Sequence, residues 1–262
     1  MSTLCVLIPY FNDGNSLINS IESIDYHHIK PDVIVIDDGS EKITASHILK
    51  AYAGALDVKL LTLDINMGIE HALNKGITSF GKNYHYIARL DCGDTCKSHR
   101  FEKQIRYMQN NPDCFLLGSW VDFTDMTGNF LYTLKQPGTQ KNIKRSMFLN
   151  SAFTHPSVIF KSEILHSVGL YPTDRPAAED YAFFFKIIKH HDAHNLQESL
   201  VSCTINPNGI STVKRKIQIR SRIRIIKENF DFSLPAFYGL ARSFALLYTP
   251  RGFTVFIKKL LF

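Results

Sequence analysis

The first 110 residues alternate between short apolar runs and helical patterns, and this alternation constrains the fold more than any other feature of the sequence. Each apolar run has the length and composition of a buried strand. Strands that alternate with helices predict a parallel, doubly wound α/β sheet flanked by helices. The expected strands are 4–8, 33–36, 58–63 and 84–90. A helical pattern with Leu17, Ile21 and Ile24 on one face follows the first strand, and the later helices are expected at 43–53, 68–79 and 100–110, the last capped by Ser98.

After residue 115 the regular alternation weakens. We expect two strands, 116–123 and 129–134, around a turn at Gly128, then a strand at 157–160 and a helix at 178–189. No internal repeat or low-complexity linker interrupts the chain. One compact domain over residues 1–210, followed by a basic helical tail over 211–262, is therefore the simplest division.

The formal charge of +6 is concentrated in the tail, where residues 214–227 contain Lys and Arg but no acid. A basic tail on a near-neutral body predicts an anionic partner, either a membrane surface or a nucleic acid. Apolar side chains at helical spacing over 234–248, and the apolar and basic end 253–262, suit a helix in a membrane interface. Packing on the catalytic domain or on a second subunit is the alternative. Nucleic acid is disfavoured because no aromatic platform accompanies the charges.

Two further features bear on location. No run of about 18 apolar residues is present, so we expect no membrane-spanning helix. The five cysteines are scattered and no secretory signal precedes them, which favours reduced thiols in the cytoplasm.

The strand ending at Leu90 runs directly into two carboxylates, Asp91 and Asp94, with Gly93 between them. Burying an unpaired carboxylate is unfavourable by several kcal/mol, roughly, so a positive partner is expected there. Ligands bind at the carboxyl ends of strands in open α/β sheets, and Mg²⁺ takes one or two carboxylates plus phosphate oxygens. The alternative is a simple turn, since Asp and Gly are turn formers.

Two other acidic pairs lie at the ends of expected elements. Asp37 and Asp38 follow the second strand, where a carboxylate can accept hydrogen bonds from a base or a ribose; helix capping by Asp38 or Ser40 is the alternative. Glu179 and Asp180 begin a helix, where acids interact favourably with the helix dipole. Either acid is also a candidate general base.

In this order the segments resemble the family 2 glycosyltransferases, inverting enzymes of the GT-A (Rossmann-like) fold that use nucleotide-sugar donors. The resemblance covers roughly residues 4–190 and rests on six motifs in sequence. The motifs are VLIPYFN at 6–12, VIDDGS at 35–40, NMGIEHALNKG at 66–76, ARLDCGD at 88–94 with RFEKQ at 100–104, HPSVIF at 155–160, and Glu179-Asp180.

The resemblance implies roles for individual residues. Asp180 is the expected catalytic base, and Glu179 shapes the acceptor site, with His155 beside it. It also divides the catalytic domain into a nucleotide-binding half, about 1–118, and an acceptor half, about 119–210. The residues expected to bind the nucleotide sugar are Pro9, Tyr10, Asp37, Asp38, Asn66, Gly68, Arg89 and Asp91, with Arg89 near the diphosphate.

The metal site departs from the family pattern. Family members often have Asp-x-Asp-Asp here, whereas this chain has Asp91-Cys92-Gly93-Asp94. Glycine thus replaces the usual direct ligand, and Asp91 or Asp94 is left to bind Mg²⁺ or Mn²⁺. Alternatively Arg89 and backbone N–H groups neutralise the diphosphate instead.

The expected function is transfer of a sugar, most simply from a UDP-sugar, to a glycan acceptor that is lipid-linked, in O-antigen or capsule synthesis. This predicts an enzyme held by its tail to the inner face of the cell membrane. The alternatives are a nucleotide-sugar-binding protein that has lost catalysis through Gly93, and a nucleotidyltransferase. The latter class should carry a Gly-rich, basic phosphate loop after the first strand; residues 9–14 have one glycine and no basic residue.

Overall fold

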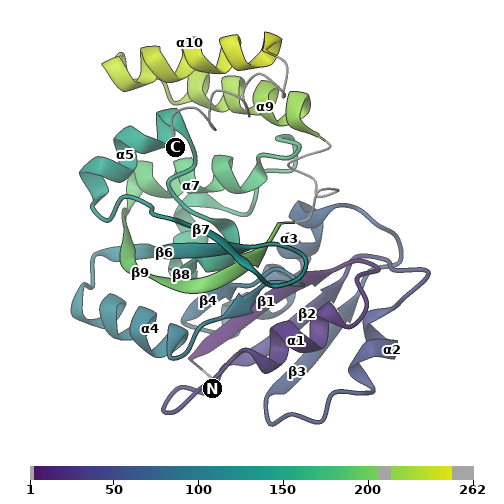
Figure 1. The fold of residues 1–262 in the computed structure, drawn as a ribbon. Coiled ribbons are helices and arrows are strands. Elements are labelled where there is room, and N and C mark those ends of the chain that lie inside the picture. Colours follow the sequence, from purple (N-terminus) through teal and green to yellow (C-terminus); the bar gives the residue numbers. More distant parts are fainter. Residues whose placement is uncertain (1–2, 206–213, 250–262) are drawn as a thin grey trace.

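The protein is an α/β structure built on one mixed, nine-stranded sheet, seen here in a computed structural model that describes residues 3–205 and 214–249 (Figure 1). Its strand order is β3-β2-β1-β4-β8-β6-β9-β5, with β7 paired to β6. The first four strands of this order run parallel, while β8 runs antiparallel to β4. The predicted doubly wound α/β arrangement is therefore confirmed for the first half of the chain.

The parallel half forms where the apolar runs predicted it. Strand β1 (Leu4–Tyr10) lies between β2 (Asp32–Asp37) and β4 (Tyr86–Arg89), and its side chains from Leu4 to Ile8 are fully buried. Burial on both faces requires continuous apolar runs rather than alternation. The carboxyl ends of all three strands lie at the same edge of the sheet, and this edge carries the acidic residues.

The second half contains two elements that the sequence pattern did not predict. Helix α5 (Gln140–Leu149) follows the β6–β7 hairpin, and β9 (Asp192–Thr204) runs parallel to β6 (Cys114–Thr124). Strand β9 includes the polar run from Asn195 to Ser199, and its register with β6 shifts around Trp120. These irregularities break the two-residue alternation that identifies a strand.

The prediction that Ser98 is the N-cap residue of α4 (Arg100–Asn110) is wrong. His99 occupies the N-cap position with a left-handed φ of 60°, and Ser98 donates its Oγ–H to Asp25 at 2.8 Å instead. The N–H of His99 also reaches both Asp25 oxygens at 3.0 Å. Asp25, on the loop after α1, therefore anchors the two residues that lead into α4.

The described part of the tail forms two helices, α9 (Arg215–Glu228) and α10 (Leu234–Tyr248), which lie together beyond α5 (Figure 1). Helix α10 packs through small residues: Ala236, Gly239 and Ser243 are buried. A Cβ at Gly239 would lie only 2.0 Å from the carbonyl oxygen of Phe148, so glycine is required for this close approach to the end of α5. The predicted segment 253–262 lies outside the described residues.

The remaining elements are listed with their bounds. They are α1 (Ser16–Glu22), α2 (Ala45–Leu49), β3 (Asp57–Thr62), α3 (Ile69–Phe80), η1 (Gly81–Asn83), β5 (Thr95–Cys96), β7 (Phe130–Leu134), η2 (His155–Ser157), β8 (Ile159–Lys161), η3 (Ser162–Ile164), α6 (Leu165–Val168) and α7 (Glu179–His190).

Candidate active site

The two aspartates that end β2 anchor the loops around the strand end. Asp37 is buried and accepts hydrogen bonds from the N–H groups of Ser40, at 2.9 Å, and Ala45, at 2.7 Å. Asp38 accepts from the N–H groups of Met67 and Gly68, both at 2.9 Å. Asp38 therefore ties the loop after β2 to the residues just ahead of α3.

The loop after β1 is tied to the loop after β2. The hydroxyl of Tyr10 donates to the carbonyl of Ile43 at 2.8 Å, and the Asn12 side chain accepts from the N–H groups of Lys42 and Ile43. Tyr10 is buried, while Pro9 is half-buried at the strand end. The two loops thus form one connected rim.

The loop between β3 and α3 completes this rim. Gly39 has a φ of +68°, and a Cβ there would lie 2.5 Å from the backbone nitrogen of Asn66, so only glycine allows the two loops to meet. Asn66 is exposed and Gly68 is half-buried at the start of α3. Residues predicted to bind the nucleotide are therefore brought together from three separate loops.

Arg89 is the most completely buried charge at this edge, with no exposed surface. Its guanidinium donates to the carbonyls of Leu7, at 2.9 Å, and Leu90, at 3.3 Å, and to His155 Nε2 at 3.3 Å. The remaining nitrogen pairs with Asp91. Every nitrogen of Arg89 is thus engaged by the protein, and the ion pair fixes the position of the Asp91 carboxylate.

Asp91 and Asp94 have different surroundings. The Asp91 side chain is 35% exposed, whereas Asp94 is buried and accepts from the N–H of Thr204 and the thiol of Cys203, both at 3.1 Å. Burial, and next the charge of Asp91, raise the pKa of Asp94. Gly93 between them has a φ of +92°. Among the described residues, Asp91 and Asp94 do not belong to any group of three closely spaced ligating side chains.

His155 and Tyr171 form the side of the site next to Arg89. His155 Nε2 lies 3.0 Å from the Tyr171 hydroxyl, and both side chains are buried. Burial, and next the Arg89 charge, lower the pKa of His155 well below its usual range. Because Nε2 accepts from Arg89, His155 is a neutral imidazole that orients Arg89 rather than an acid.

Tyr171 was not predicted from the sequence. Its backbone exchanges two hydrogen bonds with the Asn74 side chain, at 2.8 Å and 2.9 Å. Asn74 lies in the NMGIEHALNKG motif, which was the available signal. Nothing in the sequence near Tyr171 indicates this partner 97 residues away.

Glu179 and Asp180 begin α7, and the charges of Asp91 and Arg89 both act on the pKa of Asp180. Burial raises the pKa of Asp180, the Asp91 charge raises it further, and Arg89 opposes both effects. Burial, and next the charge of Asp180, raise the pKa of Glu179, whose Oε2 is buried without a hydrogen-bond partner among the described residues. The charge of Asp91 therefore acts on Asp180, although the two residues lie 89 positions apart in sequence.

Two residues of the RFEKQ motif hydrogen-bond to the backbone of the site. Arg100 and Gln104 are fully buried, and Arg100 donates to the carbonyl of Arg89 at 2.8 Å. Gln104 donates to the carbonyl of Ser157 at 2.9 Å. Two residues on one face of α4 thus fix the backbone at Arg89 and near His155.

A sheet of this order, with acidic loops at the carboxyl ends of its parallel strands, defines the GT-A class of glycosyltransferases, and solved structures agree. The chain matches the structure of S. aureus TarS 1-349 in complex with UDP-GlcNAc, with a TM-score of 0.66 and 18% identity over 94% of this chain and 70% of that one. In another crystal structure of S. aureus TarS, it covers 42% of the TarS chain. It also matches the mannosyltransferase PcManGT from Pyrobaculum calidifontis in complex with GDP-Man and Mn²⁺. The TM-score is 0.64, with 16% identity over 94% of this chain and 69% of that one.

The family model of glycosyl transferase family 2 matches residues 5–168, and the chain belongs to this family. An Escherichia coli UDP-Gal:alpha-D-GlcNAc-diphosphoundecaprenol beta-1,3-galactosyltransferase is 29% identical over 82% of this chain and 77% of its own length. An uncharacterized glycosyltransferase of Methanocaldococcus jannaschii is 33% identical over 80% of this chain and 74% of its own length. The amylovoran biosynthesis glycosyltransferase AmsE of Erwinia amylovora is 27% identical over 92% of this chain and 93% of its own length.

Proposed function

We propose that this glycosyltransferase transfers one sugar, with inversion, from a UDP-sugar to a lipid-linked glycan acceptor during O-antigen or capsule synthesis. The observation that carries the proposal is the raised pKa of Asp180 at the start of α7, which burial causes and to which the charge of Asp91, the ion-pair partner of Arg89, adds. The E. coli relative is named for a UDP-Gal donor and a diphosphoundecaprenol acceptor, and AmsE for amylovoran biosynthesis, a related setting.

The nucleotide is proposed to lie on the rim formed by the loops after β1, β2 and β3. Pro9 and the exposed Asn66 lie at its surface, while Asp38 and Gly68 form its floor. Each Asp38 oxygen accepts one N–H, and a carboxylate oxygen has capacity for a second donor from a base or ribose. Asp37 supports this rim from below.

The diphosphate is proposed to lie at Asp91. A cation is supported by the partly exposed carboxylate of Asp91, a hard oxygen donor of the kind that Mg²⁺ or Mn²⁺ binds together with substrate phosphates. When bound, such a cation would neutralise the charge of the departing diphosphate. Asp94 is buried and hydrogen-bonded to Cys203 and Thr204, whereas Asp91 is partly exposed, which favours Asp91 as the ligand and Asp94 as the residue that fastens this loop to β9.

The proposed reaction is a single displacement. The acceptor hydroxyl oxygen attacks the anomeric carbon and gives its proton to Asp180, while the bond from that carbon to the diphosphate oxygen breaks and its electron pair leaves with the nucleotide. A carboxylate whose pKa is raised is a stronger base, and it still loses its proton near neutral pH. One base without a protein nucleophile leads to inversion, and Glu179 and His155 lie on the proposed acceptor side.

The enzyme proposal is tested by product analysis with a panel of nucleotide sugars and lipid-linked acceptors. We expect a glycoside product with one donor class, and linkage analysis would identify the hydroxyl that is modified. Nucleotide binding without product for any donor would instead support a binding protein. In a parallel assay with a nucleoside triphosphate and a sugar 1-phosphate, formation of a nucleotide sugar with release of diphosphate would indicate a nucleotidyltransferase.

We also propose that α10 holds the enzyme on the inner face of the cell membrane. Its small residues face α5, and its large aromatic side chains face outward: Phe237, Tyr238 and Tyr248 are 53%, 63% and 83% exposed. The exposed Lys216 and Arg220 on neighbouring α9 suit anionic headgroups. No helix in the described ranges is long and apolar enough to cross a membrane. Surface attachment is therefore the form of association proposed.

Replacing Phe237 and Tyr248 together by serine should reduce binding to anionic vesicles by tenfold or more. Burying one large apolar side chain contributes about 1.5–3 kcal/mol, and each tenfold in affinity corresponds to about 1.4 kcal/mol. Co-sedimentation with vesicles measures the change. A matched control is Met126→Ser, which removes an exposed apolar side chain on the β6–β7 turn.

Point substitutions are preferable to removing the tail after Asp231. Truncation would also uncover the α5 surface on which Ala236 and Gly239 pack. Vesicle binding that is unchanged in the double variant would contradict the membrane proposal and favour the outward face of α10 as a contact for another protein.

A further inference from the structure

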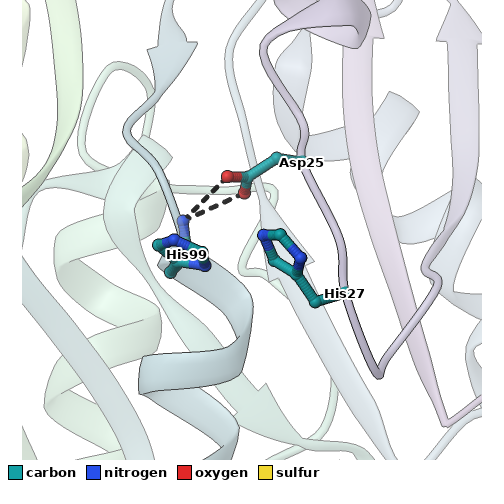
Figure 2. Close-up of side chains that lie close together, drawn as sticks. All are labelled: Asp25, His27 and His99. Atoms are coloured by element: carbon teal, nitrogen blue, oxygen red, sulfur yellow. Dashed lines mark hydrogen bonds between the residues drawn. The ribbon is translucent and has the colours of Figure 1, made fainter.

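A group of ligating side chains lies at the opposite end of α1 from the candidate active site. Asp25 and His27 lie in the loop after α1, and His99 precedes α4 (Figure 2). One ligand atom from each residue lies within 4.8 Å of the other two. The imidazole rings of His27 and His99 stack, with centroids 4.5 Å apart and planes 25° from parallel. The loop and the helix start are therefore already held in contact.

A second carboxylate, that of Glu102, holds the backbone of the loop that carries His27. Glu102 is 9% exposed, and its Oε1 accepts from the backbone N–H groups of His27, at 2.5 Å, and His28, at 3.2 Å. Its Oε2 is buried and has no hydrogen-bond partner among the described residues. A buried carboxylate with an unsatisfied oxygen is stabilised by nearby positive charge. Asp25 and Glu102 together make this end of α4 electrostatically suited to a cation.

The donor set selects the type of cation. Two imidazoles and one carboxylate suit zinc, nickel, cobalt or copper, whereas Mg²⁺ prefers oxygen ligands alone. Zinc bonds of about 2.0–2.1 Å place tetrahedral ligands about 3.4 Å from one another. His27 and His99 are exposed, so modest side-chain rotation can bring the ligand atoms from the observed spacing to this value.

We propose that Asp25, His27 and His99 form a binding site for a borderline divalent cation, with Zn²⁺ as the first candidate. The three residues supply three ligands, and water supplies the fourth. The bound ion joins the loop after α1 to the start of α4, with Glu102 as the outer carboxylate that holds the His27 backbone. This site is independent of the proposed oxygen site at Asp91, and the inference does not depend on the enzyme's substrate.

Titration of the full chain with Zn²⁺ against a chromophoric chelator tests the proposal. We expect one equivalent to bind at this site and to raise Tm, because an ion that binds only the folded state stabilises it. Replacing both histidines, His27→Ala with His99→Asn, should remove this equivalent. Asparagine is chosen at 99 because it tolerates the left-handed φ of 60°. Glu102→Gln keeps an acceptor for the His27 N–H but removes the negative charge beneath the site, so it should weaken zinc binding while leaving the loop in place.

His28→Ala is the matched control, because His28 is exposed and adjacent but is not one of the three ligands. It should keep full zinc affinity. Tm in the absence of metal separates loss of binding from loss of folding. The proposal is overturned if the wild-type chain takes up no Zn²⁺, or if the double variant binds as tightly as the His28→Ala protein.

Discussion

Replacing Asp180 by asparagine should lower the rate of sugar transfer by about 10²–10⁴-fold, the contribution typical of a general base. Asparagine keeps a side-chain oxygen that can accept the 2.6 Å hydrogen bond from the N–H of Tyr181, so the local geometry is preserved. Nucleotide affinity should stay close to the wild-type value, because Asp180 lies on another element from the proposed nucleotide rim. Single-turnover transfer and equilibrium binding of UDP measure the two quantities.

The pH profile gives an independent check on Asp180. A general base acts when deprotonated, so kcat/KM falls as pH decreases through its pKa. Burial and the Asp91 charge raise this pKa, so the acidic limb should lie above the usual range for aspartate. Asp174→Asn is the matched control, since that acid is exposed and pairs with Arg175. If Asp180→Asn were fully active, another residue would have to be the base.

Replacing Arg89 by methionine should lower the free energy of unfolding by about 1–3 kcal/mol, the usual effect of leaving buried hydrogen-bond acceptors without their donor. The variant leaves the Leu7 and Leu90 carbonyls without these donors and Asp91 without its cation. Tm should fall by roughly 5 °C, given about 2–4 °C per kcal/mol for a chain of this size. Thermal and urea unfolding measure the change.

Arg106→Met is the matched control for Arg89. It removes an exposed arginine from the same protein, and surface substitutions usually change stability by less than about 0.5 kcal/mol. A loss of stability equal in the two variants would show that the Arg89 network contributes nothing specific. Since we propose that Arg89 positions Asp91, the Arg89 variant should also weaken any dependence of activity on Mg²⁺ or Mn²⁺.

The sequence predicted the parallel half of the fold because local pattern and burial agree there. A strand buried on both faces must be continuously apolar, as from Leu4 to Ile8, and the acids after Ile36 and Leu90 mark where such strands end. The antiparallel half was harder to predict. Strand β9 contains polar residues that pair with Gly138 and Gln136, and its strand pattern is therefore interrupted.

The candidate site shows the same division. Motif order alone identified the family, and with it Asp91 and Asp180 as residues to test; their roles remain predictions. Only the tertiary structure decided what surrounds these residues, since the contacts join distant segments. In the folded protein every Arg89 nitrogen has a partner within the chain. Asp94 accepts hydrogen bonds from Cys203 and Thr204, and Tyr171 lies against His155.

By itself, therefore, the sequence determined the class of fold, the family and the strand ends at which the site forms, because these follow from local periodicity and short motifs. The tertiary structure decided which acids are buried, which are paired and which are exposed. It also brought Asp25 and His99 together and turned the aromatic face of α10 outward. The physical reason is that burial and ion pairing depend on neighbours far apart in the chain, which no local pattern encodes.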